Sequence, residues 1–414
     1  MNRDANERPW ATPSPPDSLA SLTPLAHPSR ESGVFDALPR ATAPEPNGLV
    51  ADSVIQDHRR PSASMNVEGT ILRGRALEPI EGRVVIEDGE IVAVEETAVD
   101  SANVVLPAFV NAHTHIGDSI AKEAGGDRSL DDLVAPPDGL KHRLLRAASH
   151  EELVAAMRRT IAFMRETGTG AFCEFREGNV EGVRAIAEAL ADSALDATVL
   201  GRGSVAAMEA SDGYGASGAR DDEFAREREA TREAGKLFGI HAGERDPHDV
   251  DPALDLDPDF LVHMVHAEPD HLDRVEREDR PVVVCPRSNL VTGVGLGPID
   301  ALADRTTVAL GTDNAMLDSP SLFREMEFTA KLTDLPAHEV LRMATVNGAE
   351  ILDLDCGAIE TGRAARVLVL DGDSNNLHGA RDPVRAVVRR AGVGDVERVV
   401  LPGSATTDGV ANRT

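Results

Sequence analysis

The stretch LPAFVNAHTHIGDS, residues 106–119, places two histidines one residue apart at the end of an apolar run. Alternate residues of a β-strand point to the same side, so His113 and His115 can face one space while Thr114 turns away. Imidazole nitrogens are ligands that Zn²⁺ and Fe²⁺ accept, but two of them leave a metal site incomplete. Two ordinary histidines at a strand end are the alternative interpretation. The rest of the sequence decides between the two.

From about residue 104, short apolar strands alternate with helical patterns, which is typical of parallel β/α units. Residues 151–167 and 180–193 carry apolar residues at three- and four-residue steps, as amphipathic helices do, and 221–235 reads as a more exposed helix. Eight such units over roughly 250 residues have the size of a (β/α)8 barrel. The expected strands are 103–113, 170–175, 196–201, 212–217, 237–241, 259–263, 280–285 and 305–313, of which the fourth has the weakest pattern.

The segments on either side of this region have a different pattern. Residues 65–96 alternate apolar and polar side chains between turn signals such as Asp88-Gly89, which predicts a small antiparallel sheet. Strand patterns return in 365–372, 384–392 and 396–403, where few residues remain for an independent fold. We therefore expect an α/β fold: a distorted (β/α)8 TIM-like barrel of residues 107–353, and a small β-sandwich domain built from 65–106 and 354–403.

The two ends of the chain lack these patterns. Residues 1–64 are aperiodic and rich in proline and serine, which predicts a disordered extension. Met65 is a possible translation start, which would place 1–64 outside the native protein; a tethering tail is the other interpretation. Residues 404–414 are expected to be a frayed tail.

The charge balance excludes several kinds of partner. The chain has 71 acidic and 42 basic residues, a net charge of −29, and only four of the basic residues are lysines. A chain this acidic repels nucleic acid and anionic membranes. It has no apolar run of the roughly 20 residues that span a bilayer, no apolar signal core, and three cysteines without C-x-x-C spacing. We expect a cytoplasmic protein that binds neither nucleic acid nor membrane, with the acidic, lysine-poor composition typical of halophilic archaea.

Other potential metal ligands stand at the ends of other expected strands. His241 follows one strand in GIHAGE, and Asp313 follows the eighth in GTDNA. In a β/α barrel this end of the strands builds the active site. Three histidines and one carboxylate leave positions for water, as a hydrolytic metal requires. We therefore predict a metal site made by His113, His115, His241 and Asp313.

A hydrolase also needs groups that move protons and bind the substrate. Glu244, three residues after His241, can take the proton of a water molecule and pass it to a leaving nitrogen. His263 can hold the substrate's polarised oxygen or the incoming hydroxide, and Asp313 can act as a base as well as a ligand. Arg176, Arg287 and Asn314 also stand at strand ends and are candidate substrate-binding residues; for the arginines, structural ion pairs of the barrel rim are the alternative.

Five motifs occur in the order PAFVNAHTH, HAGE, LVHMVHA, CPRSN and GTDNA, and together they resemble the amidohydrolase superfamily over about residues 66–403. The resemblance implies a distorted (β/α)8 barrel with one divalent metal ion on His113, His115, His241 and Asp313. The H-x-x-E pairing of His241 and Glu244, followed by a histidine on the next strand, is similar to the aminohydrolase branch of cytosine, guanine and adenosine-type deaminases. Imidazolonepropionase shares the pattern. No lysine ends an expected strand where it could bridge two metals, which favours a single ion, Zn²⁺ before Fe²⁺.

The expected reaction is the hydrolysis of a non-peptide C–N bond in a small cyclic substrate, most simply deamination by a metal-bound hydroxide. Ring-opening hydrolysis of a cyclic amide, which releases an acid instead of ammonia, is the alternative. A non-catalytic barrel scaffold is a hypothesis of another class, against which the retained ligands and Glu244 argue. The segments HTHIGDSIAKE and GTDNAMLDSPSLFREMEF differ from the deaminases, so substrate identity does not carry over. The oligomeric state also stays open, a homo-oligomer being one option.

Overall fold

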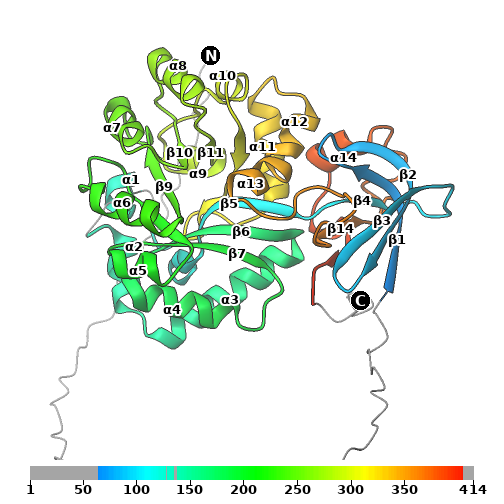
Figure 1. Cartoon of the computed structure of the whole chain (residues 1–414), viewed down its shortest axis with the longest axis horizontal. Coiled ribbons are helices and arrows are strands. Elements are labelled where there is room, and N and C mark those ends of the chain that lie inside the picture. The colour runs from blue at the N-terminus through cyan, green and yellow to red at the C-terminus, as the bar shows by residue number, and fades with distance from the viewer. Residues whose placement is uncertain (1–63, 127, 135–137, 404–414) are drawn as a thin grey trace, which may run out of the picture. The chain divides into compact units, whose positions relative to one another are not determined.

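The computed structural model describes residues 64–126, 128–134 and 138–403, which form two β-sheets and the helices around them (Figure 1). The disordered extension is predicted for 1–64; residues 1–63 lie outside the described residues, whereas Ser64 is the first residue of a strand. The predicted frayed tail, 404–414, also lies outside the described residues. Within the described ranges, no helix combines the length and the apolar character needed to cross a membrane.

The larger sheet is the predicted distorted barrel. Its strand order is β12-β11-β10-β9-β8-β7-β6-β5-β13, and all of its pairs are parallel. β12 and β13 are successive pieces of the eighth strand, so the pairing of β13 with β5 closes the sheet on itself. The strands are β5 (Phe109–His115), β6 (Thr169–Arg176), β7 (Asp196–Gly201), β8 (Gly213–Ala216), β9 (Leu237–Ala242), β10 (Phe260–His263), β11 (Val282–Val284), β12 (Val308–Leu310) and β13 (Asp313–Asn314).

The first and eighth strands are tied together by side chains. The amide nitrogen of Asn111 donates to Oγ1 of Thr312 at 2.7 Å, and the backbone N–H of Thr312 donates to Oδ1 of Asn111 at 3.0 Å. Gly311 lies beside the same strand, where an added Cβ would stand 2.7 Å from Cβ of His113. The close approach of these two strands therefore requires a glycine at 311.

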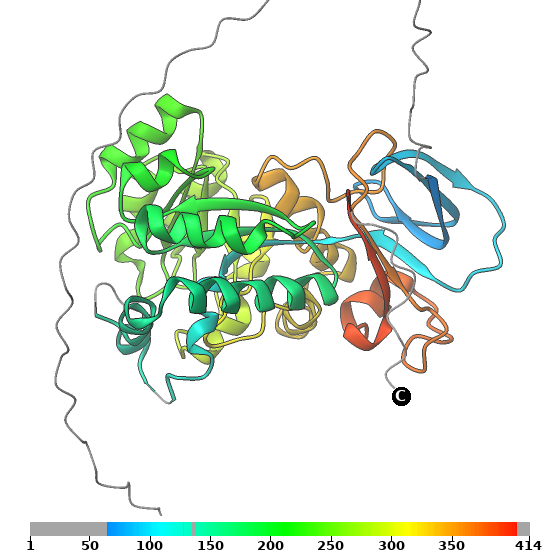
Figure 2. The same ribbon diagram turned by 90° about the horizontal axis from the view of Figure 1, so that it is seen from below.

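Helices cover the outside of the barrel (Figures 1 and 2). The three predicted helices are confirmed as α3 (His150–Glu166), α4 (Asn179–Leu190) and α6 (Ala225–Ala234). Ser149 begins α3 with a capping box: its side chain accepts from the N–H of Glu152, whose carboxylate accepts from the N–H of Ser149. The other helices are α1 (Leu130–Val134), α2 (Leu140–Ala147), α5 (Val205–Glu209), α7 (Val250–Asp255), α8 (Pro269–Arg277), α9 (Pro286–Val291), α10 (Ile299–Ala303), α11 (Leu322–Leu332), α12 (Ala337–Met343), α13 (Val346–Ile351) and α14 (Pro383–Arg389), with short 3₁₀ turns η1 (Ile116–Ala121), η2 (Pro247–Asp249) and η3 (Val393–Asp395).

The smaller sheet combines residues from both flanks of the barrel, as predicted. Its order is β15-β14-β4-β1-β2-β3, with β1 and β4 parallel and the other neighbours antiparallel. The expected turn between β2 and β3 is present, since Asp88 and Gly89 have φ of 51° and 85°. The strands are β1 (Ser64–Arg73), β2 (Glu78–Glu87), β3 (Glu90–Glu96), β4 (Val104–Pro107), β14 (Val367–Leu370) and β15 (Val396–Val400).

Two strand predictions need correction. The pattern of 384–392 predicts a strand, but this segment forms most of helix α14. Asp382 caps this helix by accepting from the N–H of Arg385 at 2.9 Å, and Pro383 occupies the first turn, where proline fits best. The expected strand 103–113 is two strands, β4 and β5, which belong to different sheets. Period-two alternation cannot show where a run of buried residues changes sheets.

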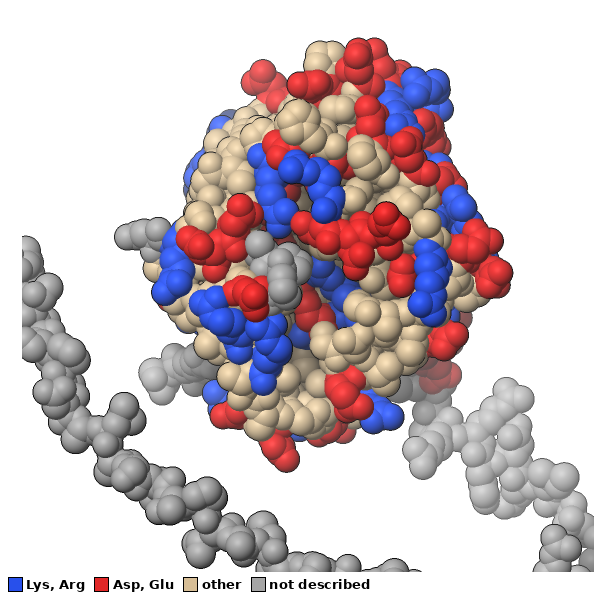
Figure 3. Space-filling model, turned by 90° about the vertical axis from the view of Figure 1, so that its left-hand side faces the viewer, with Lys and Arg blue, Asp and Glu red and all other residues tan. Residues whose placement is uncertain are grey.

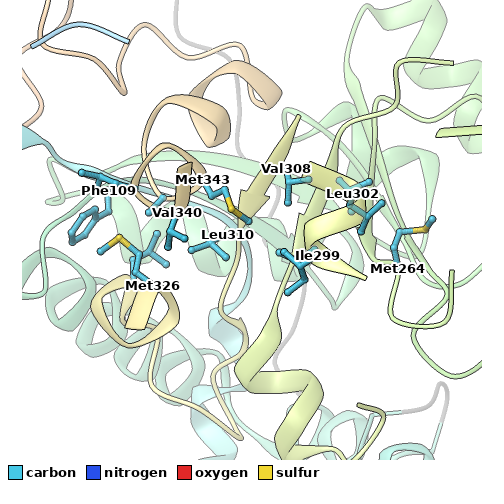
Figure 4. Close-up of a cluster of buried hydrophobic side chains, with 14 of the residues drawn as sticks. Phe109, Met264, Ile299, Leu302, Val308, Leu310, Met326, Val340 and Met343 are labelled. Carbon is cyan, nitrogen blue, oxygen red and sulfur yellow. The ribbon is translucent and has the colours of Figure 1, made fainter. Parts of the chain in front are cut away.

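Apolar side chains from the last barrel strand and the helices after it pack in one cluster (Figure 4). Leu310 of β12, Met326 of α11 and Met343 of α12 are all buried there. The ring of Phe109 at the start of β5 packs edge-to-face against Phe323, with centroids 4.9 Å apart. This packing holds β5 and β12 in place from outside, and both strands lead to the candidate site.

Candidate metal centre

Five potential metal ligands converge where the barrel strands end. The ligand atoms of His113, His241, His263 and Asp313 all lie within 4.8 Å of one another. Nε2 of His115 lies 3.4 Å from Nε2 of His241 and 3.6 Å from Oδ1 of Asp313. The structure therefore brings together every residue that the sequence predicted as a ligand, with His263 beside them.

The outer ring nitrogens of three histidines face oxygen acceptors. Nδ1 of His241 donates to the carbonyl of Ala216 at 2.7 Å, and Nδ1 of His263 donates to Oδ1 of Asn289 at 3.0 Å. Nδ1 of His115 lies 3.0 Å from Oε1 of Glu177. A neutral histidine whose Nδ1 carries the proton keeps a lone pair on Nε2, so the hydrogen bonds of His241 and His263 favour a free lone pair on the inner nitrogen. The contact of His115 meets the distance of an ion pair but not the geometry of a hydrogen bond.

The charge states of these residues fit a divalent cation. Burial lowers the pKa of His113, and lowers that of His115 to about 3, so both imidazoles are neutral near pH 7. Burial would raise the pKa of Asp313, but its contact with His113 and the nearby histidines hold it well below the usual range. Both ring nitrogens of His113 are buried and lack a hydrogen-bond partner among the described residues. Neutral imidazoles and an ionised carboxylate are the forms that bind metal, and an ion bound between these residues would satisfy Nε2 of His113.

Two of the central residues have unusual backbone conformations. His263 has φ of 80° and Asp313 has φ of 53°, both in the left-handed region that non-glycine residues seldom adopt. The hydroxyl of Ser288 donates to Oδ2 of Asp313 at 2.6 Å and holds the carboxylate in place. Such strain persists only where the surroundings enforce it, and it concentrates at functional sites.

Phe175 forms an apolar floor beneath the histidines. Its ring lies edge-on to His113 and His241, with centroids 4.5 and 5.1 Å away. Gly215 and Gly239 leave the space for this ring, because a Cβ at either position would stand 2.7 Å from it. An apolar ring therefore lines the inner side of the site, and the cavity described below approaches it from the barrel mouth.

A cavity of about 60 Å³, partly open to solvent, leads to the site. Glu244 lines it, with Oε2 3.8 Å from Nε2 of His263. Burial raises the pKa of Glu244, and the charge of Asp313 acts in the same direction, which suits a group that takes up and releases a proton. His115, His241, His263 and Asp313 also line the cavity. The remaining lining residues come from α1, α2, β13 and the segments that follow β7, β8, β9, β11 and β13: Leu130, Val134, Lys141, His142, Arg202, Ser217, Gly218, Asp221, Arg245, Asp249, Thr292, Asn314 and Leu317. Acidic and basic side chains are intermingled on this side of the molecule (Figure 3).

The three candidate substrate-binding residues are placed differently. Asn314 lines the cavity, although its Oδ1 also accepts from the N–H of Met316 at 2.9 Å. Arg176 lies buried behind the wall, where it contacts Oε1 of Glu174 at 3.2 Å. Arg287 pairs with Asp318 and with Glu325. Neither arginine is among the described residues that line the cavity, which favours the ion-pair interpretation; a role of any of the three in substrate binding stays a prediction.

The structure adds residues that support the predicted ligands. Glu174 accepts from Oγ1 of Thr114 and from the backbone N–H of Ile116, both at 2.8 Å, so it holds the residues on both sides of His115. Ser288 and Asn289 contact Asp313 and His263. A usable signal existed for Glu174, because a carboxylate in the middle of an otherwise apolar strand needs partners. Lys141 contacts Asp118 and Glu177 near the site. The sequence gives no sign of this, because Lys141 lies in a helix and is far along the chain from both residues.

Comparisons with known proteins agree with this architecture. The model of the amidohydrolase family matches residues 104–250 and 248–406. An uncharacterized protein of Methanocaldococcus jannaschii is 34% identical over 369 residues, 80% of this chain and 96% of that protein. A 5-methylthioadenosine/S-adenosylhomocysteine deaminase of Halobacterium salinarum is 28% identical over 396 residues, 82% of this chain and 90% of the deaminase. The solved structure of an atrazine chlorohydrolase from Arthrobacter aurescens, complexed with zinc, has a TM-score of 0.69 at 18% identity, covers 83% of this chain and 95% of its own, and shares the fold.

Proposed function

This chain belongs to the amidohydrolase family, whose members are metal-dependent hydrolases, and we propose that it deaminates a small cyclic substrate by hydrolysis. The enzyme class, a hydrolase of C–N bonds other than peptide bonds, follows from the family and its relatives. What we propose beyond this class is that the substrate is a small cyclic molecule and that the reaction is deamination.

One observation carries the proposal: three of the four proposed ligands, together with the proposed proton-transfer residues, line a single cavity. His115, His241, Glu244, His263 and Asp313 all contribute to its wall. His113 lies just behind them, with Nε2 3.3 Å from Oδ1 of Asp313. In this proposal a single divalent ion, Zn²⁺ before Fe²⁺, is held by His113, His115, His241 and Asp313.

When bound there, such an ion acidifies a water molecule and polarises the substrate. The carboxylate of Glu244 takes the proton of the attacking water and delivers it to the nitrogen that leaves. Nδ1 of His263 donates to Asn289, so Nε2 is the ring nitrogen that remains to contact the same water. Asp313 is a second base next to the water. The floor made by Phe175 excludes bulk water from the inner side.

Deamination is favoured over ring opening by the relatives. The Halobacterium salinarum protein, similar over most of its length, is named as a deaminase of adenosine derivatives. The cavity combines the apolar side chains of Leu130, Val134 and Leu317 with polar groups, as a flat heterocyclic substrate requires. The amino group leaves as ammonia after the water's oxygen has bonded to the ring carbon.

The test joins metal analysis with product analysis. Protein prepared with Zn²⁺ in concentrated KCl would be incubated with aminopurines, aminopyrimidines and cyclic amides, and ammonia and new carboxylic acids would be measured. Ammonia from an amino-substituted ring supports the proposal, whereas a new acid without ammonia assigns ring opening. We expect one metal equivalent in the wild type, its loss in His241→Ala, and its retention in His150→Ala, a control that alters an exposed histidine. A wild type that binds no metal, or an unchanged His241→Ala, would overturn the proposal.

A further inference from the structure

His115 differs from the other proposed ligands in what holds its outer nitrogen. Its Nε2 faces His241 and Asp313, whereas its Nδ1 lies 3.0 Å from Oε1 of Glu177. Nδ1 of His241 instead donates to the uncharged backbone carbonyl of Ala216. Of these two outer nitrogens, only that of His115 faces a carboxylate. The contact meets the distance of an ion pair but not the geometry of a hydrogen bond, so Glu177 acts on His115 through its charge. A carboxylate next to the outer nitrogen of a ligating histidine restrains the ring and makes it a stronger ligand.

Glu177 is itself held by cations from two other parts of the barrel. Nζ of Lys141, on α2, and Nη1 of Arg202, just after β7, each lie 2.9 Å from Oε1 of Glu177. Lys141 also lies 3.0 Å from Oδ2 of Asp118, and its side chain is almost completely buried. A buried charge persists only when it is paired, so these contacts hold the carboxylate in one position.

His115, Asp118 and Glu177 also have the spacing of a small cation site, since their ligand atoms lie within 4.8 Å of one another. That place is already filled by a cation of the chain, because the ammonium of Lys141 contacts both carboxylates. The cluster is therefore better explained as a support for His115 than as a second metal site.

We propose that Glu177 is a positioning residue, which holds His115 with Nε2 directed at the metal, and that Lys141 keeps Glu177 in place. This inference rests on the proposed metal site. Helix α2, which lies in the segment after β5, would then support the metal centre through Lys141. The ligand that it supports is His115, the last residue of β5.

The direct test is the Zn²⁺ affinity of metal-free protein, measured by competition with a chromophoric chelator. Glu177→Gln should weaken Zn²⁺ binding by about 10–100-fold, the usual effect of removing such a partner. Lys141→Met leaves Glu177 in place but removes its support, and should weaken binding in the same direction. Lys141→Arg, which restores the positive charge, should recover part of the affinity. Bound Co²⁺ should show a shifted visible spectrum in Glu177→Gln, because the geometry of one ligand changes.

Controls separate this inference from its alternatives. Glu188→Gln removes the carboxylate from another histidine–glutamate contact, that of His150 on the surface, and should leave Zn²⁺ affinity unchanged. A wild type without Zn²⁺ binding would refute the metal site itself. Wild-type affinity in both Glu177→Gln and Lys141→Met would refute the positioning role alone. A purely structural role predicts a lower unfolding temperature of the metal-free variants, with unchanged Zn²⁺ affinity and Co²⁺ spectrum in the folded protein.

Discussion

Oε2 of Glu244 lies 3.8 Å from Nε2 of His263, across the end of the cavity next to the proposed ligands. The two residues come from neighbouring strand ends, and no hydrogen bond joins them directly. A reacting water to one side of this pair could contact both atoms. The two side chains are therefore suited to share the proton transfer, with the carboxylate as the group that carries the proton.

Replacement of Glu244 should separate catalysis from metal binding. Glu244→Gln keeps the size of the side chain but removes its ability to carry a proton. We expect kcat to fall by about 10²–10⁴-fold, with the metal content unchanged. Turnover and metal content of the same preparation measure both effects. A loss of metal in this variant would instead make Glu244 a ligand.

Asn289 should set the tautomer of His263. Its Oδ1 accepts from Nδ1 of His263 at 3.0 Å, and both side chains are buried. Asn289→Leu removes that acceptor and allows the proton to move to Nε2, so we expect kcat to fall on the order of tenfold with bound metal retained. The shift of the pH–rate profile distinguishes the change of tautomer from simple misfolding, which lowers the active fraction equally at every pH.

Much of the site was predictable because its residues are tied to strand ends. Four of these residues lie within the last three residues of their strands, and the fifth follows β12; they are His113, His115, His241, His263 and Asp313. The barrel topology makes those ends converge. The supporting residues were not predictable in this way. Glu177 stands at a strand end, but its position alone gives it no role, and Lys141 lies on α2, where only the three-dimensional structure brings it to Glu177. Local pattern also misassigned 384–392, because Val384, Val387 and Val388 are buried in a helix as readily as in a strand.

The net charge of −29 should make stability depend on salt. Self-repulsion between acidic groups destabilises the compact state, and it is screened as the Debye length falls from about 10 Å at 0.1 M to 3 Å at 1 M. We expect the unfolding temperature to rise between 0.1 and 1 M KCl. Thermal unfolding followed by circular dichroism measures this. A rise that begins only above 1 M would indicate exclusion of salt from the protein surface, and no rise at all would contradict the screening argument.

Glu325 should give the protein a pH-dependent stability of its own. Burial raises the pKa of Glu325 from 4.5 to about 8, although Arg287 opposes this change through its backbone N–H and its guanidinium. The folded state therefore binds a proton that the unfolded state has lost, and stability should decline as the pH rises from about 4.5 to 8. A tenfold difference in proton affinity between the folded and unfolded states corresponds to about 1.4 kcal/mol. Glu325→Gln cannot ionise but keeps an oxygen that accepts from Arg287, so its free energy of unfolding should decline less over this range.

Urea unfolding at pH 5, 7 and 8.5 measures how the free energy of unfolding changes with pH. Glu327→Gln, which changes an exposed carboxylate of the same helix, should keep the wild-type slope, and an equal slope in Glu325→Gln would contradict the assignment.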